Sequence, residues 1–84
     1  MLVEVYTRSS CSYCERTREL LRIKGVPFTE YVVNGDPVRV AELLRRGGGE
    51  LPAVFVAGRL IGGCDELFVL DERGALDPLI TPSS

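Results

Sequence analysis

Two cysteines, at positions 11 and 14, are the residues of this sequence best suited to chemistry. They belong to Cys11-Ser12-Tyr13-Cys14, where an apolar, β-branched run gives way to a segment of helical periodicity. A thiol at a helix N-terminus faces unpaired backbone N–H groups and the positive end of the helix dipole, which lower its pKa and favour the thiolate. We therefore expect Cys11 to be a nucleophile. Cys14, one turn further on, would resolve the mixed disulfide that Cys11 forms.

Two polar neighbours could adjust the thiol of Cys11. Arg8 could place positive charge beside the thiolate, and Ser12 could donate a hydroxyl hydrogen bond to it. The alternative for the cysteine pair is half of a metal site, or two packed side chains. A closed zinc site requires about four nitrogen or sulfur ligands, whereas this chain has three cysteines and no histidine. The position of the C-x-x-C pair between a strand and a helix therefore favours redox chemistry.

The elements that must hold these cysteines alternate between strand and helix. Periodicity and turn residues predict strands at Leu2–Tyr6, Pro27–Val33, Leu51–Val56 and Arg59–Ile61. Helices are predicted for Cys11–Lys24, from an Asp36 cap to the glycines at 47–49, and from an Asp65 cap to Gly74, with residues 75–84 as a tail. This order predicts an α/β domain whose first two strands are parallel through a right-handed crossover.

Spacing also predicts which side of each helix is buried. Tyr13, Thr17, Leu20, Leu21 and Lys24 fall on one side of the first helix; the residues expected to face inward are Val40, Leu43 and Leu44 in the second helix, and Leu67, Phe68, Val69 and Leu70 in the third.

Length and composition fit one small domain spanning residues 1–84. The 84 residues are 45% hydrophobic and 26% charged, and their net charge of −2 gives no overall attraction to nucleic acid or a membrane surface. No apolar run is long enough to cross a bilayer, and the N-terminal run lacks the basic flank of a leader. Three cysteines cannot all pair within one chain, which suits a reducing compartment. We expect a cytoplasmic protein without a nucleic-acid or membrane partner.

The chain contains three motifs: C-x-x-C at 11–14, Leu51-Pro52, and Gly62-Gly63-Cys64-Asp65. Through these motifs it resembles the glutaredoxin family over nearly its whole length. The resemblance implies a thioredoxin fold, with a four-stranded mixed sheet flanked by three helices in the order β-α-β-α-β-β-α. It also implies a dithiol active site that usually reads C-P-Y-C. Ser12 replaces that proline here, a departure that bears on the redox potential and on metal chemistry.

The resemblance further implies a groove for glutathione. Pro52 would be a cis-proline facing the active site, and the backbone of Leu51 would pair with the cysteine part of glutathione. Gly63, Cys64 and Asp65 would hold the γ-glutamyl end, with N–H groups on its carboxylate and Asp65 on its ammonium group. The alternatives are a proline that merely begins a strand, a packed Cys64, and a helix cap at Asp65.

The second carboxylate of glutathione needs a cation. Arg8 matches the basic residue that family members place just before the active site, and Arg39 is a second candidate whose alternative is an exposed helix face. Tyr13 is expected to form a wall of the groove, with packing in the core as its alternative.

These features favour a thiol–disulfide oxidoreductase that uses glutathione to reduce protein disulfides and glutathione mixed disulfides, with no bound cofactor. The expected partners are glutathione and disulfide-containing or glutathionylated proteins, and the expected state is a monomer. Two alternatives stay open. Two chains could hold a [2Fe–2S] cluster through their Cys11 thiolates and two glutathiones, or the protein could be a thioredoxin-like redoxin reduced by a flavoprotein.

Overall fold

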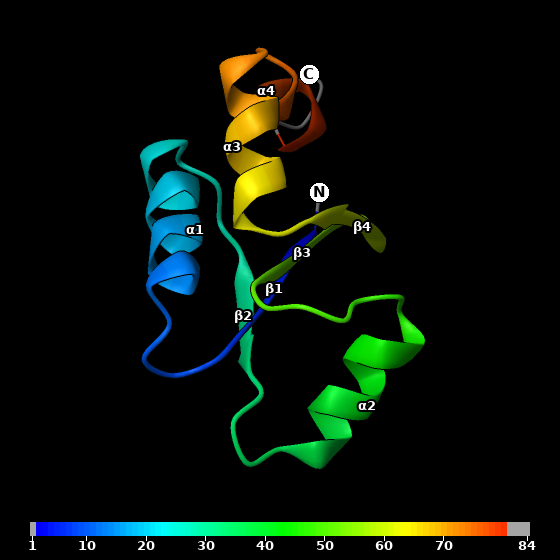
Figure 1. Cartoon of the computed structure of the whole chain (residues 1–84). Coiled ribbons are helices and arrows are strands. Elements are labelled where there is room, and N and C mark those ends of the chain that lie inside the picture. The colour runs from blue at the N-terminus through cyan, green and yellow to red at the C-terminus, as the bar shows by residue number, and fades with distance from the viewer. Residues whose placement is uncertain (1, 81–84) are drawn as a thin grey trace.

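Four strands and four helices follow one another along residues 2–80, the residues that this computed structural model describes (Figure 1). The strands are β1 (Val3–Thr7), β2 (Thr29–Val32), β3 (Ala53–Val56) and β4 (Arg59–Gly62). The helices are α1 (Ser12–Ile23), α2 (Pro37–Arg45), α3 (Cys64–Glu72) and α4 (Leu76–Ile80). The order confirms the predicted β-α-β-α-β-β-α arrangement and adds a short fourth helix. None of these helices is long and apolar enough to cross a membrane.

The strands form one mixed sheet in the order β2-β1-β3-β4. β1 pairs parallel with β2 and antiparallel with β3, and β4 completes a hairpin with β3. All five residues of β1 are buried, because this strand lies between two others and has helices on both of its faces. The mixed sheet and the parallel pairing of the first two strands confirm the predicted thioredoxin fold.

The register of the sheet brings three distant segments to one end of it. Tyr6, near the end of β1, pairs with Ala53 at the start of β3, and Val54 pairs with Gly62 at the end of β4. The chain that leaves β1, the chain that enters β3 and the chain that leaves β4 therefore lie at the same end of the sheet. These segments contain the three motifs singled out in the sequence.

Successive residues of each strand point to opposite layers. One layer, here called the apolar face, is covered by α1, α3 and α4 (Figure 1) and is built from Val3, Val5, Leu20, Leu21, Val54, Val56, Leu67, Leu76 and Ile80. The other, here called the aromatic face, is covered by α2 and contains Tyr6, Val33, Leu43, Ala53 and Phe55, with Tyr31 and Leu51 packed against them.

Helix α2 packs its polar side against the aromatic face. The guanidinium of Arg39 lies 4.1 Å from the centre of the Tyr31 ring. The hydroxyl of Tyr6 donates a hydrogen bond to the carboxylate of Glu42. The helix therefore supplies the partner that the buried hydroxyl of Tyr6 requires.

The predicted inner side of α2 is consequently wrong in part. Leu43 is buried, but Val40 is exposed and Leu44 is 61% exposed. Of these three apolar residues, Leu43 is the one on the same side of α2 as Arg39 and Glu42, which face the sheet. Local spacing could not show that polar partners in the sheet would decide the rotation of α2.

The predicted inner side of α3 is also too broad. Leu67 is fully buried and Leu70 is partly buried against the apolar face, whereas Phe68 and Val69 are exposed. A short helix lying on a sheet buries one stripe of residues spaced by three or four positions, and Phe68 and Val69 fall outside that stripe.

The predicted tail contains the extra helix α4. Its first and last residues, Leu76 and Ile80, are buried against the apolar face. Pro78 lies in the first turn, where its missing N–H breaks no helical hydrogen bond. The ammonium of Lys24 lies 3.0 Å from a carboxylate oxygen of Asp77 and joins the end of α1 to this helix. The rest of the predicted tail, residues 81–84, lies outside the described residues.

Candidate active site

Cys11 is the N-cap of α1, as the sequence predicts. Its backbone is extended, with φ −117° and ψ 111°, and its Sγ accepts a hydrogen bond from the backbone N–H of Cys14 at 3.2 Å. Cys11 is 4% exposed and Cys14 is fully buried, and both are free thiols. The sulfur of Cys11 is thus the more accessible of the two and receives the N–H groups at the start of the helix.

The two thiols differ sharply in acidity. Burial alone would raise the pKa of Cys11, but the thiol and N–H of Cys14, the charge of Arg8 and the N–H of Tyr13 together bring that pKa below its ordinary value. Burial, and then the contact with Cys11, raise the pKa of Cys14 to about 11. Near neutral pH the proton therefore belongs on Cys14, and negative charge is favoured on Cys11.

The loop between β1 and α1 is held from the neighbouring strand. Ser10 has a positive φ of 56°, so the chain turns sharply just before Cys11. The N–H of Ser9 donates to Oδ1 of Asn34, which follows β2, at 2.6 Å. Asn34 was not among the predicted site residues, and its only signal in the sequence is the Asn34-Gly35 turn.

A cavity of about 300 Å³ lies at this end of the sheet. It is lined by Tyr13, Glu50, Leu51, Pro52, Gly63, Cys64, Asp65 and Glu66. Six of these residues are among the predicted substrate-binding residues, so the fold brings all three motifs to one groove. Tyr13 is 54% exposed, which excludes the alternative that it packs in the core. The Leu51–Pro52 peptide is cis, as the resemblance implies.

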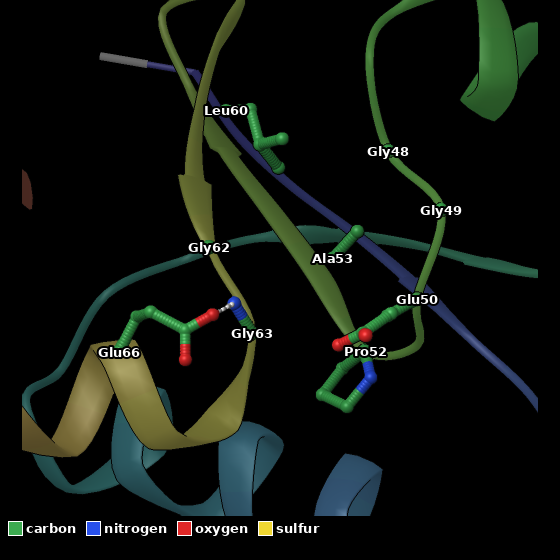
Figure 2. Close-up of a pocket in the computed structure, with 9 residues that line it drawn as sticks. All are labelled: Gly48, Gly49, Glu50, Pro52, Ala53, Leu60, Gly62, Gly63 and Glu66. Atoms are coloured by element: carbon green, nitrogen blue, oxygen red, sulfur yellow. Dashed lines mark hydrogen bonds between the residues drawn. The ribbon is translucent and has the colours of Figure 1, made fainter.

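A smaller cavity of about 150 Å³ adjoins the groove and shares Glu50, Pro52, Gly63 and Glu66 with it. Figure 2 shows it between the Gly62-Gly63 turn and the segment that runs from Gly48 to Pro52. The turn is tight: a Cβ on Gly62, which has a φ of +140°, would lie 2.6 Å from Cβ of Glu66. A Cβ on Gly63 would lie 3.1 Å from the carbonyl oxygen of Pro52. Glycine is therefore required at Gly62, and it lets the turn approach Pro52 closely.

The cap of α3 differs from the prediction. Gly63, not Asp65, is the N-cap, and its N–H donates to Oε1 of Glu66 at 3.0 Å (Figure 2). The first backbone hydrogen bond of the helix runs from Leu67 N–H to the carbonyl of Gly63. The N–H groups of residues 64–66 have no carbonyl of their own helix to bind and can receive an anion. Asp65 is exposed beside them, and Cys64 is buried.

Two residues that line the groove were missed in the sequence. Glu50 and Glu66 line both cavities. Each is next to a predicted motif, but nothing in the sequence indicates that the two would line the same groove. The pairing of β3 with β4 brings both segments to it, and that pairing is a property of the fold.

Three predicted contributions are absent from the groove. Ser12 is exposed and gives no hydrogen bond to Cys11 among the contacts of residues 2–80, so the predicted hydroxyl donor is wrong. Arg8 is exposed and lines neither cavity, although its charge lowers the pKa of Cys11. Arg39 is engaged with Tyr31 and with Glu42, whose carboxylate lies 3.1 Å from its guanidinium.

A metal centre finds no support in the part of the chain that the structure describes. Within residues 2–80, no three His, Cys, Asp or Glu side chains gather in a group that could hold a metal ion.

A thioredoxin fold with a free dithiol at the start of its first helix defines a class of proteins, the thiol–disulfide oxidoreductases. The sequence matches the glutaredoxin family over residues 3–61. It is 44% identical over 79 residues to glutaredoxin 3 of Escherichia coli (strain K12), covering 93% of this chain and 95% of that protein. A probable glutaredoxin of Synechocystis is 42% identical over 80 residues, covering 93% and 91%. The chain belongs to the glutaredoxin family.

Solved structures agree with this assignment. The crystal structure of a buckwheat glutaredoxin–glutathione complex superposes with a TM-score of 0.82 at 30% identity, covering 94% of this chain and 76% of that one. The holo form of glutaredoxin C1 from Populus tremula x tremuloides gives a TM-score of 0.82 at 32% identity, covering 93% and 81%. Glutaredoxin from Brucella melitensis gives 0.82 at 38% identity, covering 95% and 88%.

Proposed function

We propose that this glutaredoxin uses glutathione to reduce glutathionylated proteins and protein disulfides, acting as a single-domain monomer. The observation that carries the proposal is the contrast between the two thiols. The Sγ of Cys11 accepts the N–H of Cys14 and has a lowered pKa, whereas the pKa of Cys14 is raised to about 11. Cys11 can therefore attack a disulfide as a thiolate, whereas Cys14 stays protonated until it resolves the mixed disulfide.

With a glutathionylated protein, the Cys11 thiolate attacks the glutathione sulfur of the mixed disulfide. A bond forms between Cys11 and glutathione, and the protein thiolate leaves and takes up a proton. A second glutathione thiolate then attacks this new disulfide, which releases oxidised glutathione and restores the Cys11 thiolate. This route needs Cys11 alone.

With a protein disulfide, Cys11 forms a mixed disulfide with one substrate sulfur and releases the other as a thiolate. That thiolate can accept the proton of Cys14, whose pKa of about 11 keeps it protonated until this moment. The Cys14 thiolate then attacks the sulfur of Cys11, which forms the Cys11–Cys14 disulfide and frees the reduced substrate. Two glutathiones reduce that disulfide in turn.

The groove supports glutathione as the reductant. The free N–H groups at residues 64–66 suit the γ-glutamyl carboxylate, and Asp65 is exposed at the same place to meet the ammonium group. Leu51 and Pro52 line the wall opposite, where an extended peptide can pass. Arg8 lies outside both cavities, and its charge acts on the thiol of Cys11. The solved complex of buckwheat glutaredoxin with glutathione is a further support.

A glutathione-coupled turnover assay with a glutathionylated peptide tests the proposal. Cys11→Ser should abolish turnover, and Cys14→Ser should retain it on this substrate while losing activity on a protein disulfide. Cys64→Ser is the matched control, because Cys64 lines the groove and the proposed exchange uses only the sulfurs of Cys11 and Cys14. Turnover by the Cys11→Ser protein, or turnover by the native protein with a flavoprotein reductase but not with glutathione, would contradict the proposal.

A further inference from the structure

The loop that forms one wall of the groove is rich in glycine. Residues 47–51 join the end of α2 to Pro52, and three of them are Gly47, Gly48 and Gly49. Gly48, Gly49 and Glu50 line the smaller cavity (Figure 2), and Glu50 and Leu51 line the larger one. Because glycine has the greatest backbone freedom of all residues, a loop of this composition does not fix its own path. Its two ends must do so.

The far end of the loop is held by the sheet. Ala53 directly follows Pro52 and pairs with Tyr6 of β1. The near end is Arg46, the C-cap of α2. Its guanidinium donates to Oε1 of Glu4 at 2.8 Å, to Oε2 of Glu4 at 3.3 Å and to the hydroxyl of Tyr6 at 2.8 Å. It also lies 4.0 Å from the centre of the Phe55 ring.

These partners make Arg46 a clamp across two strands. Glu4 of β1 and Phe55 of β3 are directly paired in the sheet, and Tyr6 lies two residues beyond Glu4 on the same face. A single side chain therefore fixes the end of α2 against the two strands whose ends carry Cys11 and Pro52. The contact is largely shielded, since the side chains of Arg46 and Glu4 are 23% and 11% exposed.

The first two residues of the loop, Gly47 and Gly48, are hydrogen-bonded to the end of α2, which Arg46 holds in place. The N–H of Gly47 donates to the carbonyl of Leu44 at 3.1 Å, and that of Gly48 to the carbonyl of Leu43 at 3.0 Å. Gly48 is buried, and a Cβ there would collide with the side chain of Leu43. Only residues 49–51 lie between this folded-back segment and Pro52. A shift at the end of α2 would thus pass directly to Glu50 and Leu51.

We infer that Arg46 is a positioning residue for substrate binding: by clamping the end of α2 to Glu4, Tyr6 and Phe55, it holds residues 49–51 as the wall of the groove. This inference rests on the proposed glutathione function, because the wall matters for the part of the substrate that lies in the groove. It assigns Arg46 no contact with the reacting sulfurs. Removing the clamp should weaken binding and leave the chemical step unchanged.

Arg46→Lys tests this with a matched control, Arg45→Lys, one residue earlier on an exposed part of the same helix. Lysine keeps the charge at position 46 but cannot bridge Glu4 and Tyr6 with a planar fork. We expect KM for a glutathionylated peptide to rise roughly fivefold, with kcat and the pKa of Cys11 unchanged. Arg45→Lys should alter neither. An unchanged KM in a folded Arg46→Lys protein, or equal losses in kcat and kcat/KM, would overturn the inference.

Amide hydrogen exchange separates the inference from the proposed function. Arg46→Lys should accelerate exchange several-fold at Gly47 and Gly48, whose N–H groups are bonded to the carbonyls of Leu44 and Leu43 in the native protein, while the amides of α1 keep their native rates. If the native protein shows no turnover with glutathione, the proposed function fails, yet this exchange result still decides whether Arg46 fixes the loop. Tyr6→Phe serves if Arg46→Lys does not fold, because it removes one bond of the clamp and leaves Glu4 in place. Native exchange rates at Gly47 and Gly48 in these variants would refute the clamp.

Discussion

The two faces of the sheet are stabilised by different chemistry. The apolar face is a continuous cluster of aliphatic side chains from β1, β3 and three helices. The aromatic face combines Tyr6 and Phe55, whose rings meet edge to face with centroids 5.5 Å apart, with an ionic network from α2. Both faces belong to the same strands. They differ because successive residues of a strand point to opposite faces, and each face is covered by different helices.

The two faces of the sheet support different parts of the site. The apolar face supports α1 and α3, whose first turns carry Cys11 and the free N–H groups of the groove. Their attachment by many aliphatic contacts is strong but adaptable, since dispersion contacts have little directionality. The aromatic face supports the end of α2, from which a glycine-rich loop leaves. A directional clamp suits that task, because hydrogen bonds fix orientation as well as distance.

The largest test of the comparison is Leu67→Ala on the apolar face. Leu67 is fully buried, and its truncation should leave a cavity and lower the free energy of unfolding by about 3 kcal/mol. Leu44→Ala on α2 is the matched control and should lower it by less than about 0.5 kcal/mol, because Leu44 faces solvent. Urea unfolding followed by circular dichroism measures both. Equal losses would show that the two faces are not distinguished by aliphatic burial.

A smaller effect is expected from the ionic network on the aromatic face. Arg46→Met should lower the free energy of unfolding by about 2 kcal/mol, chiefly because the shielded carboxylate of Glu4 loses its cation. Adding Glu4→Gln should recover at least half of this loss, since the amide carries no charge and still accepts from the Tyr31 hydroxyl. The double-mutant cycle is read by the same urea unfolding. Additive losses would mean that the two side chains do not interact.

The sequence predicted the apolar face better than the aromatic one. Val3, Val5, Leu20 and Leu21 follow simple strand and helix spacing and are buried as expected. On α2 the same reasoning also predicted that Val40 and Leu44 face inward, because it considers the apolar residues of one element without its neighbours. The rotation of α2 depends on the opposite surface, where Glu4 and the hydroxyl of Tyr6 require polar partners, and that information lies in the pairing of elements.

The site divides in the same way. Cys11, Cys14, Pro52 and Gly63 could be found from the sequence because each belongs to a local motif whose chemistry can be named. Glu50, Glu66 and the clamp at Arg46 could not, because their roles depend on antiparallel register across segments far apart in the chain. The expected hydroxyl bond from Ser12 failed for a local reason, since backbone N–H groups already occupy the sulfur of Cys11.

Acid titration sharpens the contrast further. The hydrogen bond from Arg46 is the main cause that holds the pKa of Glu4 below its ordinary value, against the opposing effect of burial. A depressed pKa in the folded state adds stability above the unfolded carboxyl pKa of about 4.3, and this stability is lost as the pH falls through the folded value. Arg46→Met should therefore flatten the decline in unfolding free energy below about pH 4.5. Leu67→Ala should lower the whole curve and keep its shape; a parallel shift in both variants would contradict the assignment of the acid sensitivity to Glu4.

The smallest expected effect lies where α1 begins, on the apolar side of the sheet. Ser12 is the first residue of the helix, and a proline at this position has the backbone angle that the helix needs and loses no helical hydrogen bond. Ser12→Pro should raise the free energy of unfolding by about 0.5 kcal/mol, because it restricts the unfolded chain. Since Ser12 gives no hydrogen bond to Cys11, the pH dependence of Cys11 alkylation should stay as in the native protein. A shift in that profile would show that the residue acts on the thiolate after all, whereas added stability with an unchanged profile would place its contribution in the helix alone.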